Sequence, residues 1–387
     1  MTYSPGDVLE RWSVTVEALS PLHVGAGGPP LLADWDVVPD PRRPDGYLVL
    51  DLPRVLERVP PQRWERPTHQ PPTAWVERGV WPSLARYTLV WHPPGPPTGA
   101  PPPREIHPFT KGPDGATPYL PGSSLKGALR SALARQYARP QQVAAALARL
   151  LERPPGRQWA GQELEEALFG PTDTPRHHAP HTDLLRTLHV GDLHPQGAVA
   201  LELALAQVHS LRAGRLEGKD QRSFTYLEVV PTDARFAGAV TVEGYPFRQE
   251  HAPVGLPSAR RPDLALEGLR AALRRDGLAR FQQEARFHQE HGPAAASAWY
   301  QRALRRVASL PPESFPLQLG WGPGWGSKAV SSLLLQDASF ARVRQEYRLG
   351  RGDAPFPKSR RLLVTPSDAI PLGWVVVTLA PAQGRGA

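Results

Sequence analysis

The sequence contains no cysteine, and this absence excludes disulfide bonds, thiolate zinc sites and cysteine nucleophiles. It has one methionine and 47 prolines, a composition typical of selection for heat tolerance. No apolar run reaches the length of about 18 residues that spans a membrane, and no charged-then-apolar leader opens the chain. We therefore expect a soluble, cytoplasmic protein with no membrane partner and no cofactor.

Lysine is also scarce: the chain has five, so arginine supplies most of its positive charge. Lys plus Arg total 45 against 37 for Asp plus Glu, which gives a formal net charge of +8. The planar guanidinium group binds phosphate bidentately and stacks on bases, so this balance suits a polyanionic partner. A GC-rich genome would enrich arginine as well, and composition alone does not choose between the two explanations.

Hydrophobic periodicity predicts an α+β fold built from one sheet domain with large insertions. Alternating or buried apolar patterns predict strands at residues 12–19, 186–190, 199–207, 236–242 and 372–379. Spacing of three and four residues predicts helices at 118–138, 141–151, 161–169 and 263–307, the last broken near Gly292-Pro293. Residues 39–115 are proline-rich, and 92–104 cannot form a helix or a central strand.

The helix predicted at 118–138 begins after the sequence Pro-Gly-Ser-Ser, and Ser123 or Ser124 can cap its start. Helix N-termini attract phosphate through free N–H groups and the helix dipole. Lys126 and Arg130 lie one turn apart beside the apolar stripe, and Gly127 leaves room for another backbone. Spacing alone favours a capped surface helix with two solvated cations over a phosphate site.

A glycine-rich segment, residues 317–330, has the sequence LQLGWGPGWGSKAV. Gly320, Gly322, Gly324 and Gly326 allow positive φ angles and close approach to a ligand backbone. Trp321 and Trp325 could stack on bases or brace the loop against the core, and Lys328 could reach phosphate. The segment is not a nucleotide-binding P-loop, because Ser327 precedes Lys328 and Ala329 follows it.

The stretch from Lys219 to Phe236 interleaves cations and aromatics, with Arg222 and Phe224 beside Tyr226. Single-stranded nucleic acid is bound through this combination of charge and stacking. A β-hairpin with ordinary cross-strand pairs would have the same pattern, so the stretch gains weight only together with the other two.

The histidines and acidic residues give only weak signals of a metal site or a catalytic site. His177, His178 and His181 form one group, and His288 and His291 lie three apart on a predicted helix, but no H-E-x-x-H motif accompanies them. His23 enters a glycine loop after the first strand, where it could act as a general acid or base or simply pack. Asp34 and Asp36 would point the same way from an extended segment, which suits metal binding or salt bridges.

Four stretches together resemble the RAMP superfamily (repeat-associated mysterious proteins) of CRISPR effector complexes. In chain order they are SPLHVGAG, YLPGSSLKGALRSAL, FTYLEVVPTDARFAGAV and LQLGWGPGWGSKAV. The second is the most specific, and the last is most similar to the fifth Csm subunit of type III-A complexes. The resemblance implies an RRM-like, ferredoxin-like sheet core formed by 1–38, 116–140, 186–245 and 315–387. The proline-rich insertion is then 39–115, with a helical insertion at 141–185 and a helical region at 246–314.

The resemblance also implies a crRNA-binding subunit that holds the 3′ part of the crRNA, supports its maturation and complex assembly, and does not cut the target. Other Csm subunits are implied as partners, and target RNA as a further one. Ser123, Ser124, Lys126 and Arg130 would then face RNA phosphates. Gly25, Gly27 and the loop from Gly320 to Lys328 would lie near the same groove, and His23 would belong to it.

Two enzymatic alternatives stay open at the level of sequence. The first is a metal-independent endoribonuclease that processes crRNA, with His23 as general acid or base and Lys126 or Lys328 stabilising the transition state. The second is a metal-dependent nuclease that uses Asp34 or Asp36.

Overall fold

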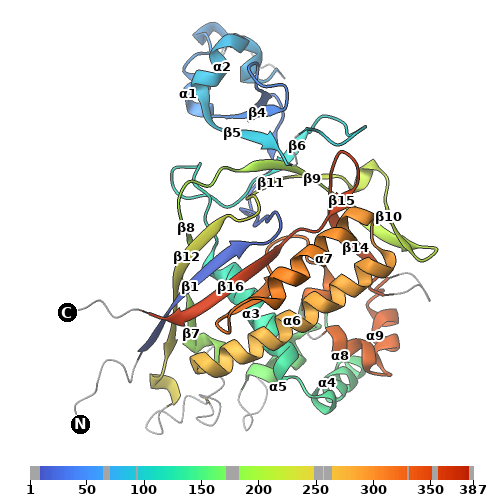
Figure 1. Cartoon of the computed structure of the whole chain (residues 1–387). Helices are drawn as coiled ribbons and strands as arrows, with labels where there is room; N and C mark the ends of the chain where they lie inside the picture. The colour runs from blue at the N-terminus through green and yellow to red at the C-terminus, as the bar shows by residue number, and fades with distance from the viewer. Residues whose placement is uncertain are drawn as a thin grey trace, which may run out of the picture.

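The computed structural model describes residues 9–63, 70–92, 95–170, 183–247, 256, 264–328, 331–350 and 356–382. These residues form two β-sheets with helices packed beside them (Figure 1). The predicted α+β class is therefore confirmed. No helix among them is long and apolar enough to cross a membrane.

The first sheet holds the two ends of the described chain side by side at its centre (Figure 1). Its strand order is β13 (Ser314–Gln318), β16 (Trp374–Pro381), β1 (Leu9–Ala18), β12 (Arg235–Glu243) and β7 (Leu188–Val190), with β8 (His194–Pro195) also paired to β12. All these pairings are antiparallel. The inward residues of β1, from Trp12 to Ala18 at every second position, are buried, as the alternating pattern predicts.

Two long helices pack on this sheet. α3 (Gly122–Tyr137) contacts β7, and α6 (Leu266–His291) contacts β13 and α3, while α7 (Ala294–Ala308) packs on α6 (Figure 1). The predicted break near Gly292-Pro293 is confirmed, since α6 ends there and α7 begins after it. Glycine permits the close packing: a Cβ at Gly122 would collide with the backbone of Val190, and one at Gly277 with that of Pro316.

The second sheet lies above the first in Figure 1. Its main strand order is β2 (Leu31–Leu32), β6 (Glu105–His107), β11 (Thr225–Val229), β9 (Glu202–Arg212), β5 (Ala85–Trp91), β4 (Gly46–Leu50) and β3 (Val37–Pro39). Further strands are β10 (Arg215–Gly218), β14 (Ser359–Val364) and β15 (Ala369–Ile370). The proline-rich region 39–115 thus contributes three strands, together with α1 (Leu52–Leu56) and α2 (Trp81–Leu84). Its described residues 95–104 form neither helix nor strand, as predicted.

Four shorter helices form a layer beside α3 (Figure 1). They are α4 (Pro140–Glu152), α5 (Gln162–Phe169), α8 (Ser331–Gln336) and α9 (Phe340–Glu346). Single 3-10 turns occur at Pro61–Arg63, Pro72–Trp75, Arg78–Val80, Arg157–Trp159, Leu184–Thr187, Gln221–Ser223, Tyr245–Phe247 and Trp325–Ser327.

Candidate nucleic-acid interface

A groove of about 980 Å³ lies between the N-terminal glycine loop, α3, the short-helix layer and the glycine-rich loop of residues 319–328. We call it the main groove. Eight of the predicted binding residues line it: Gly25, Gly27, Ser124, Arg130, Trp321, Trp325, Ser327 and Lys328. The other six do not: His23, Ser123, Lys126, Arg222, Phe224 and Gly324. Segments separated by about three hundred residues in the chain thus share one surface.

The two glycine loops are joined directly to each other. The N–H of Trp321 donates to the carbonyl of His23 at 2.8 Å, and the N–H of Leu319 donates to the carbonyl of Gly373 at 2.8 Å. Gly320 has φ +79°, and a Cβ there would collide with the carbonyl oxygen of His23. Only glycine meets both demands, a left-handed backbone and a close backbone contact.

Both tryptophans of the loop brace it against the protein. The guanidinium carbon of Arg361 lies 4.8 Å from the ring centroid of Trp321. Trp325 packs against Phe340 and Phe356, with ring centroids 5.8 and 4.8 Å apart. Both indoles are half-buried and line the main groove, so bracing leaves part of each ring facing the cavity.

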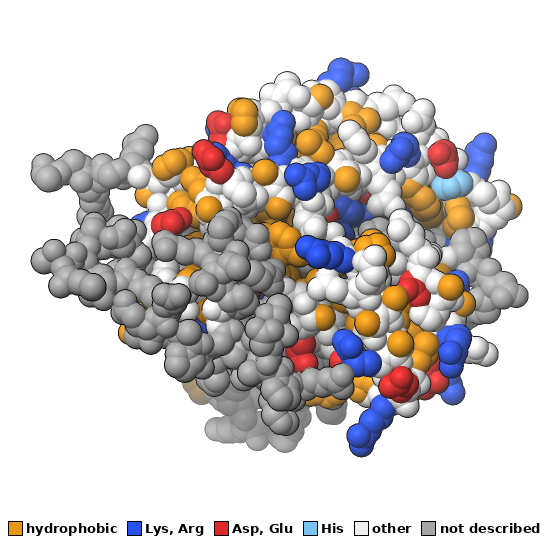
Figure 2. All heavy atoms as spheres, turned by 90° about the horizontal axis from the view of Figure 1, so that it is seen from below, with side chains coloured by type: hydrophobic (Ala, Val, Ile, Leu, Met, Phe, Trp, Pro, Cys, Tyr) orange, Lys and Arg blue, Asp and Glu red, His pale blue; other side chains and the backbone are white. Residues whose placement is uncertain are grey.

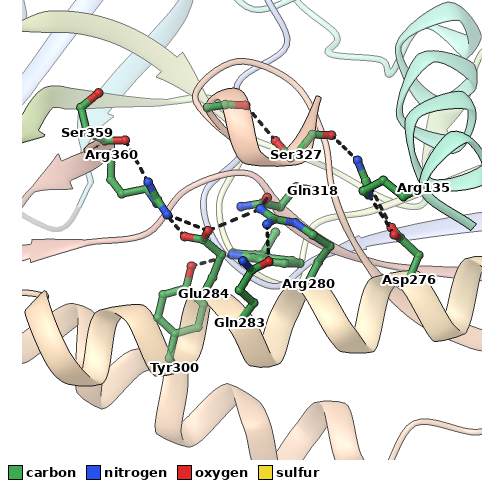
Figure 3. A network of polar contacts seen from close by, with 12 residues as sticks. Arg135, Asp276, Arg280, Gln283, Glu284, Tyr300, Gln318, Ser327, Ser359 and Arg360 are labelled. Atoms are coloured by element: carbon green, nitrogen blue, oxygen red, sulfur yellow. Dashed lines mark hydrogen bonds and ion pairs between the residues drawn. The ribbon is translucent and has the colours of Figure 1, made fainter. Parts of the chain in front are cut away.

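Arg135 of α3, paired with Asp276 of α6, binds the C-terminal end of the glycine-rich loop (Figure 3). Arg135 donates to the carbonyl of Ser327 at 2.9 Å and makes two hydrogen bonds to Asp276, at 2.8 and 2.7 Å. Ser327 Oγ donates to the carbonyl of Gly324 at 3.1 Å. Lys328 follows this anchored turn and is exposed, so its ammonium group is the cation that the loop presents at the groove.

The start of α3 is closed differently from the prediction. Its N-cap is Pro121, without a side-chain capping bond, so capping by Ser123 or Ser124 is wrong. The N–H of Gly122 instead donates to Asp192 Oδ1 at 2.8 Å. A carboxylate therefore already occupies part of the positive helix end.

The two cations of α3 have different surroundings. Arg130 makes ion pairs with Asp183 at 2.8 Å and Glu165 at 3.0 Å, and its guanidinium lies 4.2 Å from the Phe169 ring centroid. Its charge is thus balanced by two carboxylates at the wall of the groove. Lys126 is half-buried, and burial lowers the pKa of its ammonium group, partly offset by the attraction of Asp183. Lysine at this position is available for a phosphate without breaking a described ion pair.

His23 is buried, with 2% of its surface exposed, so its ring offers no face to the groove. Its Nδ1 lies 2.7 Å from the carbonyl oxygen of Glu228, to which a neutral ring donates. Burial lowers the pKa of His23 to about 4, so the ring is neutral at pH 7. These surroundings contradict direct RNA contact by the His23 side chain, which ties the N-terminal glycine loop to β11, while its backbone carbonyl joins the two glycine loops.

Sequence reasoning missed the buried ionic groups that position the loops. Glu228, fully buried, accepts from the hydroxyl of Tyr87 at 2.6 Å, from the N–H of Phe109 at 2.8 Å and from Lys111. Arg135 was missed as well. It continues the apolar stripe of α3, and a cation on an apolar face is the signal that predicts a buried ion pair.

The predicted acidic pair lies on a turn. Asp34 has φ +65°, and Asp36 accepts from the N–H of Leu32 at 2.8 Å, so the extended segment that would align the carboxylates is wrong. No group of three potential metal ligands occurs among the described residues.

The two histidines predicted on the helix, His288 and His291, have different surroundings. His288 is buried and stacks on Tyr300, while Nδ1 of His291 bonds the carbonyl of Gly214 at 2.8 Å. His177, His178 and His181 lie outside the described residues.

The third predicted region forms a turn before β11. Arg222 is exposed there, with its N–H bonded to Asp220 Oδ1 at 3.2 Å, and Phe224 packs against the main hydrophobic core. Neither residue lines the main groove, so this region and the two glycine loops form separate surfaces. Seen from below Figure 1, Lys and Arg side chains are spread over the visible face rather than gathered in one patch (Figure 2).

The family model of the RAMP superfamily matches residues 15–327. The chain belongs to the RAMP superfamily. This RAMP protein is similar in fold to a chain in the cryo-EM structure of a Csm–crRNA–target RNA ternary complex of a type III-A CRISPR–Cas system. That match has a TM-score of 0.67 and 22% identity, and it covers 96% of this chain and 100% of that one. The crystal structure of T. onnurineus Csm5 matches with a TM-score of 0.60 and 21% identity, over 94% and 99% of the two chains. Curated proteins gave no match.

Proposed function

We propose that this RAMP protein is a crRNA-binding subunit of a type III-A CRISPR effector complex, corresponding to the fifth Csm subunit. It holds the 3′ part of the crRNA and supports crRNA maturation and complex assembly. Its partners are the crRNA, other Csm subunits and, through the assembled complex, target RNA. The fold likeness to Csm5 and to a chain of a Csm–crRNA–target RNA complex supports the proposal.

One observation carries it: the N-terminal glycine loop, α3 and the glycine-rich loop meet in the main groove. Each of these segments was expected from the sequence to approach a phosphate backbone. A groove bordered by glycines lets main chain come close to a polymer, and Lys328 adds an exposed cation. Contacts of this kind carry no base information, which suits a subunit that must accept any spacer sequence.

The fold supports an RRM-like core. In chain order, β1, α3, β7, β12, α6 and β16 form a β-α-β-β-α-β unit, and their sheet order is β16-β1-β12-β7 with antiparallel pairings. This order of elements and strands supports a ferredoxin-like core. We assign the core to residues 1–38, 116–140, 186–245 and 315–387, with the regions 39–115, 141–185 and 246–314 added to it.

The role is non-catalytic. His23 is buried and does not line the main groove, so its ring reaches no substrate bound there as general acid or as general base. Lys328 and Lys126 are then phosphate-holding groups and not transition-state groups.

Crosslinking tests this proposal. The complex is assembled with crRNA labelled at its 3′ end, irradiated and digested, and modified peptides are mapped. We expect crosslinks in residues 24–28 and 319–328. The proposal fails if the 3′ label crosslinks only to other subunits or only to the region of Arg222 and Phe224.

Variants sharpen this test. Lys126→Ala combined with Lys328→Ala should reduce crRNA retention, because Lys328 lines the main groove and Lys126 lies on α3 between the lining residues Ser124 and Gly127. Lys358→Ala is the matched control, since Lys358 lies neither in the main groove nor on α3, the helix that forms one wall of the groove. Equal retention in all three proteins would contradict phosphate binding by these lysines. Arg130→Ala is less informative because it also breaks the ion pairs with Asp183 and Glu165.

A further inference from the structure

A buried ionic cluster lies behind the glycine-rich loop (Figure 3). It consists of Arg135 from α3, Asp276, Arg280 and Glu284 from α6, and Arg360 from β14. Their side chains are between 4% and 14% exposed. We call these five residues the arginine cluster. They do not line the main groove, so they cannot contact a ligand bound there directly.

Two of the three arginines are matched by a carboxylate. Arg135 makes two hydrogen bonds to Asp276, and Arg360 makes two to Glu284, at 2.8 and 3.0 Å. Arg280 shares Glu284 at 3.4 Å, a weaker contact. Three guanidinium groups therefore face two carboxylates, which leaves one positive charge in the cluster. Neighbouring His288 does not change this balance, because burial lowers its pKa to about 4 and it is neutral at pH 7.

Of the three arginines, Arg280 has the longest contact with a carboxylate, so we assign the remaining positive charge to it. Its Nη1 donates to Gln283 at 2.8 Å and its Nη2 to Gln318 at 3.5 Å, and both acceptors are neutral amides. Its Nε has no hydrogen-bond partner among the described residues, although the atom is buried. A buried donor in this state is costly unless something nearby compensates its charge.

Arg280 lies against the glycine-rich loop, close to the wall of the main groove. A Cβ on Gly326 would lie 3.0 Å from Arg280 Nη2, so the loop backbone rests against the guanidinium without a side chain between them. A cavity of about 10 Å³ is lined by Arg280, and it shares Ala128, Gln318 and Ser327 with the wall of the main groove. A charge behind so thin a protein layer is screened far less than an exposed one.

We propose that Arg280 raises RNA affinity from the side of the loop away from the main groove: its incompletely compensated positive charge attracts a phosphate in the groove without touching it. The inference rests on the proposed RNA-binding function and adds a residue to that site. Arg280 is thus a positioning and electrostatic residue, whereas Lys328 meets the phosphate from the groove side.

The test compares Arg280→Gln with Arg280→Lys in the full-length protein. Affinity for a labelled single-stranded oligouridine is measured from about 50 to about 200 mM salt, and each variant is also unfolded thermally. We expect Arg280→Gln to lose about tenfold in affinity and Arg280→Lys, which keeps the charge, to remain near wild type. Arg286→Gln is the control, because it removes a charge from an exposed position of the same helix.

Salt dependence separates this role from direct contact. Loss of a phosphate-contacting lysine in Lys328→Ala should lower the slope of log affinity against log salt by about 0.7. Arg280→Gln should keep the wild-type slope and lose affinity at every salt concentration, since a buried charge is weakly screened. The inference is overturned if the Gln and Lys variants lose affinity equally, or if a folded Arg280→Gln protein binds like wild type.

A second variant covers the case in which Arg280→Gln does not fold. Arg280→Met removes the charge with an apolar side chain of similar length, and Glu284 keeps its two hydrogen bonds to Arg360. Reduced affinity relative to Arg286→Met, at an exposed position of the same helix, supports the inference, and unchanged affinity overturns it. If wild type itself shows no salt-dependent RNA binding, alone or in the complex, the proposed function fails instead.

Discussion

Replacing Gly320 by alanine should separate the two glycine loops of the main groove. Gly320 has φ +79°, and its Cα faces the carbonyl oxygen of His23 so closely that a Cβ has no room. Because the obstacle is backbone and not the end of a flexible side chain, the loop must move away. The N–H of Trp321 then loses its bond to the same carbonyl.

The magnitude can be built from these contacts. A left-handed φ costs alanine about 1 kcal/mol. The lost hydrogen bond adds about 1 kcal/mol, and displacement of the Trp321 ring from its aromatic and cationic neighbours adds about 1 kcal/mol. We therefore expect Gly320→Ala to lower the free energy of unfolding by about 3 kcal/mol, the sum of these costs.

Gly324→Ala is the matched control. Gly324 has φ +80°, but a Cβ there would have only the carbonyl oxygen of Gly322 near it, at 4.0 Å. This variant should lose about 1 kcal/mol, the backbone cost alone. Denaturant unfolding of the three proteins measures the difference, and crRNA retention should fall in Gly320→Ala more than in Gly324→Ala. Equal losses in the two variants would show that the contact with His23 does not hold the loops together.

Four further predictions concern single side chains in buried and exposed surroundings. Arg135→Ala should destabilise the protein by about 3–5 kcal/mol, because it leaves Asp276 buried without its partner and releases the Ser327 carbonyl. Arg306→Ala, which breaks partly exposed pairs with Glu17 and Asp233, should lower the free energy of unfolding by less than about 1 kcal/mol, and denaturant unfolding of both variants measures the difference. His288 should oppose folding in acid: its folded pKa of about 4 lies below the ordinary value of 6.5, so the unfolded chain takes up the proton first. Stability is then complete above about pH 6.5 and falls by about 3 kcal/mol towards pH 4, and thermal unfolding of His288→Phe should show a smaller decrease than wild type. Lys328→Ala should reduce the salt slope of RNA binding by about 0.7, and a slope equal to that of wild type would remove Lys328 from the phosphate contacts.

The sequence predicted those parts of the fold that depend on local pattern. Apolar alternation located β1 and β12, and helical spacing located α3, α4, α6 and α7, because side-chain period follows directly from backbone geometry. The strands of the proline-rich region were missed, since β5 pairs with β9, far away in the chain, and β4 joins the sheet by pairing with β5. Pairing between distant segments leaves no local signature.

For the main groove, the sequence predicted the segments that form it but not the partners of their side chains. Glycine spacing indicated the two loops, and the family resemblance brought them together. The partners of Arg130 and the burial of His23 could not be predicted, because Asp183, Glu165 and Glu228 come from elements whose positions only the fold determines. Arg280 was invisible in the sequence as well, since it is one of several arginines on a charged helix until the structure places it behind Gly326.

The central position of β16 determines when the groove can form during synthesis. Residues 374–381 must insert between β1 and β13, and Gly373 anchors the loop through Leu319. A nascent chain that has not yet released these residues from the ribosome lacks the strand that fixes both glycine loops. Because translation is slow compared with the collapse of a domain, the earlier segments wait with open sheet edges. The groove of the proposed RNA-binding function can therefore form only in chains that have been completed through β16.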